Sequence, residues 1–100
     1  MDGNKVVITG IGVVTPIGTG KEEFWENLKK GQNGVKIIRH FQKFSTCIAA
    51  TIEDFNPRQY MEKRDVKKMD RFTQFAYSAA QMAIEDANLD LQKENKEKTG

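Results

Sequence analysis

A glycine-rich stretch near the amino end is the first part of the chain that could perform chemistry. Residues 6–25 read VVITGIGVVTPIGTGKEEFW, and two common motifs of similar composition bind the phosphates of nucleotides. The dinucleotide-binding motif needs glycine at its first, third and sixth places; Gly10 and Gly12 fit, but Thr15 takes the sixth place. A P-loop ending just after Gly20 would need glycine in place of Thr15 and Ser or Thr at position 22, which is glutamate. We therefore predict no phosphate site, and we interpret the glycines as marking a bulge or a close approach of another backbone segment.

Cysteine and histidine occur once each, at Cys47 and His40. A nucleophilic cysteine needs a base beside it, and a zinc site needs several spaced thiols or imidazoles. The sequence offers neither arrangement, so we predict no metal site and no cofactor. We expect Cys47 to be a small buried apolar residue, and His40 to be a surface or hydrogen-bonded residue.

A run of basic residues is the clearest candidate for binding a partner. Within "KRDVKKMDR", at positions 63–71, only two aspartates oppose the positive charges, which belong to Lys63, Arg64, Lys67, Lys68 and Arg71. Helical spacing places Arg64, Lys67 and Lys68 on one face. This face is either an ordinary solvated helix surface or a site for an acidic partner.

The composition indicates a soluble chain of at most one ordinary domain. Its 100 residues are 38% apolar and 30% charged, and the longest apolar run is too short to cross a bilayer. A net charge of +2 is too balanced to indicate nucleic-acid binding, and one cysteine without a disulfide partner fits a reducing compartment. We predict a cytoplasmic protein that binds neither a membrane nor nucleic acid.

The amino-terminal third predicts a strand followed by a helix. Val6–Val14 is apolar on both faces, which is typical of a strand buried between two layers. Thr19 and Glu22 have the spacing of a capping box, which predicts a helix over Lys21–Lys30 that ends at Gly31.

Weaker signals follow in the middle of the chain. We predict short extended segments at Val35–Ile38 and Cys47–Ile52. Asn56 and Pro57 have the character of a helix start, so a short helix through about Met61 is expected.

The strongest periodic pattern predicts a helix over Arg71–Asn88 with Asp70 as its N-cap. Its apolar face is mostly alanine and comprises Phe72, Phe75, Ala76, Ala79, Ala80, Ala83, Ile84 and Ala87. Such small side chains allow a helix to lie close to other backbone, so we expect a central element of a larger body.

These elements do not suffice for a sheet with a covering layer on each side, which the strand Val6–Val14 requires. Either the two weak extended segments pair with this strand in a small sheet, or the chain is the leading part of something longer. We favour the second explanation.

Three blocks of sequence resemble one family. The blocks are T-G-x-G-V-V-T-P at 9–16, F-W-x-x-L-x-x-G at 24–31 and M-D-R-F-x-Q-x-A at 69–76. In this order they resemble the amino-terminal portion of β-ketoacyl-acyl carrier protein synthases of the type II condensing-enzyme group, which polyketide ketosynthase domains also share. The resemblance extends from about residue 5 to residue 90.

The resemblance implies a fold class and a reaction. The fold would be α/β, the N-terminal part of a thiolase-like five-layered α/β/α/β/α body, incomplete in this chain and without an internal domain boundary across residues 1–100. The reaction would be a decarboxylative Claisen condensation of acyl and malonyl groups on acyl carrier protein, performed by a homodimer. The family's catalytic cysteine and two histidines would lie outside this chain, so neither Cys47 nor His40 takes their place.

The resemblance also implies a role for the basic run, because related synthases bind the acidic helix of acyl carrier protein there. We assign carrier-protein binding to Arg64, Lys67 and Lys68. Other readings remain open: a polyketide ketosynthase segment, a stand-alone module that binds an acidic partner such as carrier protein or nucleic acid through Lys63–Arg71, and a decarboxylating relative that lacks the cysteine.

Overall fold

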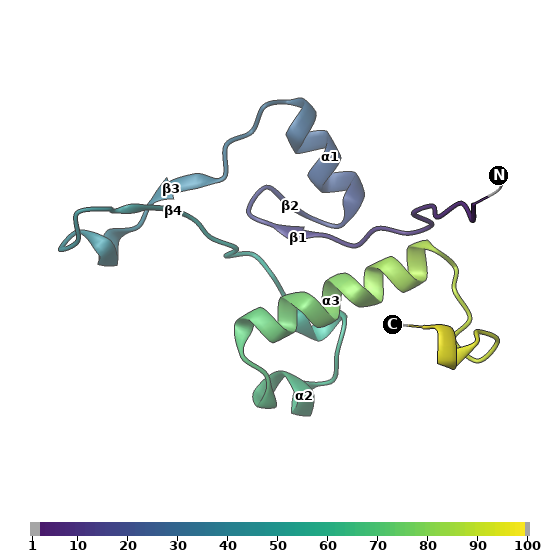
Figure 1. Ribbon diagram of the computed structural model, residues 1–100. Helices are drawn as coiled ribbons and strands as arrows, with labels where there is room; N and C mark the ends of the chain where they lie inside the picture. The colour runs from purple at the N-terminus through teal and green to yellow at the C-terminus, as the bar shows by residue number, and fades with distance from the viewer. Residues whose placement is uncertain (1–2, 100) are drawn as a thin grey trace.

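The computed structural model describes residues 3–99, which form an open arrangement of short helices and two small antiparallel β-hairpins (Figure 1). The Cα radius of gyration is 17.5 Å, whereas a compact domain of this length has a value of about 13 Å. Among the described residues, the buried apolar side chains are those of Ile38, Phe55 and Met61. Residues 3–99 therefore do not close around one core.

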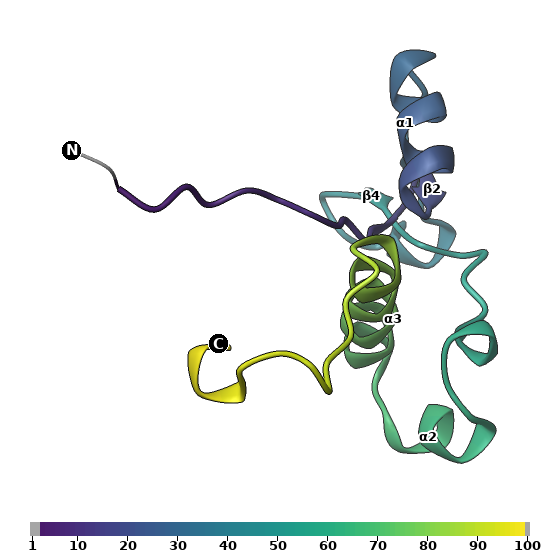
Figure 2. The ribbon, with the colours of Figure 1, turned by 90° about the vertical axis from the view of Figure 1, so that its right-hand side faces the viewer.

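The predicted strand Val6–Val14 is absent over most of its range. Only its last residue belongs to a strand, β1 (Val14–Thr15), and residues 3–13 have no regular secondary structure. Val6, Val7 and Ile8 are 94%, 72% and 82% exposed, so the prediction of a doubly covered strand is wrong for this segment. The physical reason is that a strand needs a hydrogen-bonded neighbour, and no described strand pairs with residues 3–13. Figure 2 shows the leading part of this segment running away from the other elements.

A tight hairpin leads into the first helix. β1 pairs antiparallel with β2 (Gly18–Thr19), and α1 (Lys21–Lys29) begins two residues later. The predicted helix is confirmed, but the predicted capping box is wrong. Gly20 is the N-cap, with a φ of 90° that glycine adopts freely, and no side-chain hydrogen bond caps the helix.

The end of α1 follows the prediction. Gly31 has a φ of 71°, in the left-handed region. Its N–H donates to the carbonyl oxygen of Leu28 at 3.0 Å, and the N–H of Gln32 donates to that of Asn27, also at 3.0 Å. These two bonds form the usual glycine-terminated closure of a helix.

The two weak extended segments are confirmed as strands, in shortened form. β3 (Val35–Ile37) pairs antiparallel with β4 (Ile48–Ala50), with Ile37 opposite Ile48. A single 3₁₀ turn, η1 (Arg39–Phe41), lies in the connection. The strands pair with each other and leave residues 6–13 without a partner, and their hairpin projects from one side of the molecule (Figure 1).

The expected short helix after Asn56 is one 3₁₀ turn, η2 (Pro57–Gln59). The side-chain oxygen of Asn56 accepts a hydrogen bond from the N–H of Arg58 at 3.1 Å, which confirms the cap. The chain continues through α2 (Lys63–Lys68) into α3 (Arg71–Asp86), and a last 3₁₀ turn, η3 (Lys96–Lys98), lies near the carboxyl end. Within residues 3–99 the helices are all too short or too polar to cross a membrane.

α3 is confirmed with small corrections at both ends. Asp70 is in the N-cap position, but its side chain makes no capping hydrogen bond. The helix stops two residues before Asn88, because Asn88 adopts a left-handed φ of 54°. The N–H of Asn88 donates to the carbonyl oxygen of Glu85 at 3.1 Å, so an asparagine closes α3 as a glycine closes α1.

The alanine face of α3 lies directly against the glycines of the amino-terminal segment. A Cβ atom added at Gly12 would lie 1.9 Å from the carbonyl oxygen of Ala79, and one at Gly10 would lie 2.3 Å from that of Ala83. No side chain fits in that space. The interpretation of these glycines as sites of close backbone approach is confirmed, and the prediction for the alanine face is confirmed at Ala79, Ala83 and Ala87. Three other residues of the predicted face, Phe72, Ala76 and Ala80, are exposed.

Candidate functional site

The basic residues of α2 lie on the outside of the molecule. Arg64, Lys67 and Lys68 are all exposed, whereas Val66 of the same helix is half-buried. Met61, just before α2, is 9% exposed. Val66 and Met61 thus turn toward the protein while the cations face solvent. We call Arg64, Lys67 and Lys68 the basic face.

The carboxylates near the basic face only partly neutralise it. The Nε atom of Arg64 lies 3.3 Å from Oε2 of Glu62 and 4.0 Å from Oδ1 of Asp65. Among residues 3–99, no carboxylate lies within ion-pair distance of the amino group of Lys67 or Lys68. These two lysines are in the last turn of α2, where the helix dipole favours positive charge. The basic face therefore presents net positive charge to an approaching molecule.

Gln74 connects α3 to the basic helix, and sequence reasoning missed it. Gln74 is only 7% exposed. The Nε2 atom donates to the carbonyl oxygen of Val66 at 3.1 Å and to that of Met69 at 3.2 Å. The feature of the sequence that could have indicated this role is the position of Gln74 beside Phe75, at the border of the apolar face of α3.

Arg71 does not belong to the basic face, although it belongs to the same run in sequence. Its guanidinium donates to the carbonyl oxygens of Ile52 at 3.3 Å and Phe55 at 3.5 Å. The same group lies 5.5 Å from the ring centre of Phe55 and 5.1 Å from that of Phe75. The charge of this exposed residue is thus taken up by contacts within the chain, beside aromatic rings that attract cations.

Cys47 and His40 lie in the connection between β3 and β4. Cys47 is half-buried, so the expectation of a buried residue is only partly met, and its carbonyl oxygen accepts a hydrogen bond from Ile38 at 2.7 Å. His40 is exposed, and its ring packs edge-on against Phe41 at 4.6 Å between ring centres. Across residues 3–99, no three residues of the types His, Cys, Asp and Glu gather where they could hold a metal ion.

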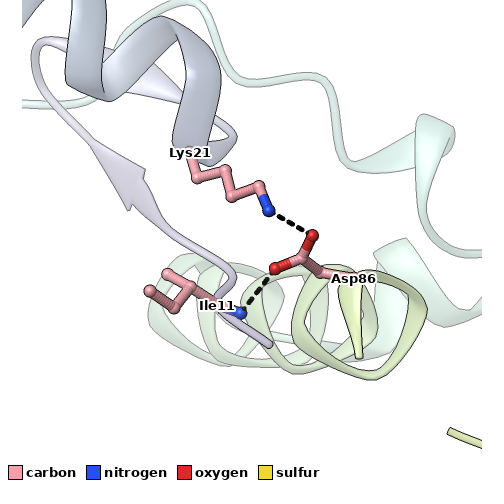
Figure 3. Close-up of polar contacts among 3 residues, drawn as sticks. All are labelled: Ile11, Lys21 and Asp86. Atoms are coloured by element: carbon pink, nitrogen blue, oxygen red, sulfur yellow. Dashed lines mark hydrogen bonds and ion pairs between the residues drawn. The ribbon is translucent and has the colours of Figure 1, made fainter. Parts of the chain in front are cut away.

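Asp86 links the end of α3 to two segments that lie 65 and 75 residues away in sequence (Figure 3). One carboxylate oxygen accepts a hydrogen bond from the N–H of Ile11 at 3.0 Å, and the other accepts from the amino group of Lys21. The hydrogen bond from Lys21, followed by that from Ile11, lowers the pKa of Asp86 below its usual value. The same bond raises the pKa of Lys21. The acid therefore joins the amino-terminal segment and α1 to the end of α3.

A family model described as "Beta-ketoacyl synthase, N-terminal domain" matches residues 3–100. The chain is 38% identical over 102 aligned residues to the 3-oxoacyl-[acyl-carrier-protein] synthase 2 of Vibrio harveyi. This alignment includes 100% of the chain and 25% of the relative, so the chain spans about a quarter of that protein's length.

Solved structures show the same likeness. The ishigamide ketosynthase/chain length factor matches with a TM-score of 0.73 and 35% identity, over 86% of this chain and 22% of that one. A type II polyketide synthase ketosynthase solved in complex with its acyl-carrier protein matches with a TM-score of 0.63 and 26% identity, over 89% and 23%. These matches confirm the expected fold class, the N-terminal part of a thiolase-like α/β fold. The chain belongs to the β-ketoacyl synthase family, and its residues correspond to the N-terminal domain of that family.

Proposed function

We propose that this chain is the leading segment of a 3-oxoacyl-acyl carrier protein synthase that elongates fatty acids by decarboxylative condensation of acyl and malonyl groups. The observation that carries the proposal is the 38% identity to the Vibrio harveyi synthase over the whole chain. Because the chain corresponds to a quarter of that relative, we place the nucleophilic cysteine and the two histidines elsewhere in the complete protein. The segment by itself is then inactive.

Within this function, the basic face binds acyl carrier protein. Arg64, Lys67 and Lys68 are exposed and carry net positive charge, which suits the acidic surface of a carrier protein. A solved relative was captured with its carrier protein, which supports the class of partner. The remaining parts of the proposal follow from the family: a homodimer in the cytoplasm, with residues 1–100 as part of the first half of the subunit and no domain boundary among them.

The test is charge reversal in the complete protein, with Arg64→Glu, Lys67→Glu and Lys68→Glu combined. If each exposed contact contributes about 0.2–1 kcal/mol, the KM for carrier-bound substrates should rise roughly tenfold at low salt. The effect should shrink as salt screens the charges, and turnover of small thioester mimics should stay nearly constant.

A matched control reverses three exposed lysines near the carboxyl end, Lys93, Lys96 and Lys98, because it changes the net charge by the same amount. Equal rises of KM in both triple variants would indicate a general charge effect, and equal losses on carrier-bound and small substrates would count against docking. The purified 100-residue chain should form no condensation product; any product would contradict the placement of the catalytic residues elsewhere.

A second candidate is a ketosynthase of polyketide assembly, which the 35% identity and TM-score of 0.73 to the ishigamide ketosynthase favour. The two candidates differ in the primer that the complete enzyme extends. A fatty acid synthase should prefer saturated acyl primers, whereas a polyketide ketosynthase should also extend primers that keep their β-keto groups. Comparing the two primer types under single turnover decides between them.

A further inference from the structure

The basic helix α2 cannot hold its own position. It has six residues, and isolated helices of that length are unstable in water. The chain leaves the helix at Met69 in an extended conformation, with φ of −109° and ψ of 138°. The orientation of its lysines must therefore come from contacts with another element.

Gln74 supplies such contacts on either side of the two lysines. Its amide nitrogen donates to the carbonyl oxygens of Val66 and Met69, the residues directly before and directly after Lys67 and Lys68. Both bonds come from one side chain that is nearly excluded from solvent. The backbone of Lys67 and Lys68 is thus fixed at both ends by a single group.

That group is itself held on a rigid element. α3 has 16 residues, and the N–H of Gln74 donates to the carbonyl oxygen of Asp70 at 3.0 Å in its first turn. One turn earlier, Arg71 bonds the carbonyl oxygens of Ile52 and Phe55. Side chains on well-packed helices position their neighbours more accurately than loops do.

We propose that Gln74 is a positioning residue for carrier-protein recognition: it orients Lys67 and Lys68 without contacting the carrier protein. The inference rests on the proposed function of the basic face. It adds a buried neutral amide to a site otherwise made of exposed cations, and it assigns a role to the glutamine of the M-D-R-F-x-Q-x-A block.

The experiment uses Gln74→Met in the complete enzyme, because methionine keeps the length of the side chain and removes the amide group that bonds α2. Gln81→Met is the matched control: Gln81 is on the same helix, and its amide bonds Glu85 at 3.3 Å and not α2. We expect Gln74→Met to raise the KM for carrier-bound substrates about three- to tenfold, as loss of a hydrogen bond typically does. The kcat on small thioester mimics should not change, and backbone amides of residues 63–69 should exchange faster. Gln81→Met should change none of these quantities.

A double-mutant cycle tests whether the effect passes through the lysines. In a background of Lys67→Glu and Lys68→Glu, Gln74→Met should change KM less than twofold, because the groups that it orients are gone. The same increase in both backgrounds overturns the proposal, and so does an unchanged KM in Gln74→Met when charge reversal alone raises KM. If charge reversal itself has no effect, the docking function fails, and this outcome is distinct from failure of the positioning role alone.

Discussion

The two halves of α3 hold their neighbours by opposite means. The amino-terminal half uses long polar side chains, Arg71 and Gln74, which reach backbone carbonyls 5–19 residues away in sequence. The carboxyl-terminal half uses alanines and one acid, Asp86, against residues 65–75 positions away in sequence.

The difference shows how one helix can serve two tasks. Polar side chains give directional bonds, which suit the precise placement of a short helix such as α2. Small side chains give close backbone contact, which suits a tightly packed interior. The half of α3 nearest the basic face is therefore the half that orients it, while the other half holds the amino-terminal segment in place.

The largest effect on stability should come from adding a side chain where the glycines contact the alanine face. Gly12→Val would place a Cβ atom 1.9 Å from the carbonyl oxygen of Ala79, so the segment must move away from α3. We expect the free energy of unfolding of the complete protein to fall by about 1–3 kcal/mol or more, measured by urea denaturation.

Gly31→Asn is the matched control for that substitution. Gly31 has no atom within 4 Å of an added Cβ, and its φ of 71° is one that asparagine tolerates. The free energy of unfolding of the Gly31→Asn variant should change little. A loss of stability at Gly31 as large as that at Gly12 would show that loss of glycine itself, and not contact with α3, causes the effect.

A smaller effect is expected at the polar half. Arg71→Met keeps a long apolar side chain but loses two hydrogen bonds and the contacts with the rings of Phe55 and Phe75. We expect a loss of about 1 kcal/mol in the free energy of unfolding. Amide exchange should become faster around η2 and α2, and should stay constant in the residues near Gly12. Faster exchange at both places would mean that the two halves of α3 are not independent.

The smallest effect should be that of Asp86→Asn, because the carboxylate and its partner Lys21 are accessible to solvent. The pKa of Asp86 is lowered by its bonds to Lys21 and Ile11, so its contribution to stability is present above its ordinary pKa and is lost as the pH falls through the lowered value. From about pH 5 downward, the unfolding free energy of the original protein should therefore decrease more steeply than that of Asp86→Asn. Parallel curves from urea denaturation at each pH would contradict this assignment.

Patterns that depend on near neighbours in sequence were predictable. The helices over α1 and α3, the cap at Asn56 and the turn at Gly31 are specified by a few adjacent residues, and the structure has them. The close approach of other backbone at the glycines and at the alanine face was also predicted, but for each feature separately; that Gly10 and Gly12 lie against α3 is seen only in the structure. The resemblance to condensing enzymes, which the family comparison confirms, came from motif order and not from these physical patterns.

Features that depend on distant partners were not predictable. Thr19 has the type and spacing of a helix cap, but it is taken up in β2, and Gly20 takes its place. Gln74 bonds α2 and Asp86 bonds Lys21. No local pattern in the sequence indicates that these residues are neighbours in the structure. Arg64, Lys67 and Lys68 are exposed on one helix, yet Arg71 could not be separated from them without knowing that Phe55 and Phe75 lie beside its guanidinium.

The exposed amino-terminal segment has a consequence for handling the purified chain. Val6, Val7 and Ile8 are β-branched, largely exposed and free of strand pairing among residues 3–99. A stretch of this kind is a template for edge-to-edge association, and the nearest charged residue in sequence, Lys5, is next to it as a gatekeeper. At high concentration the chain should therefore aggregate through residues 6–8, and chaperones that bind short apolar stretches should recognise the same three residues.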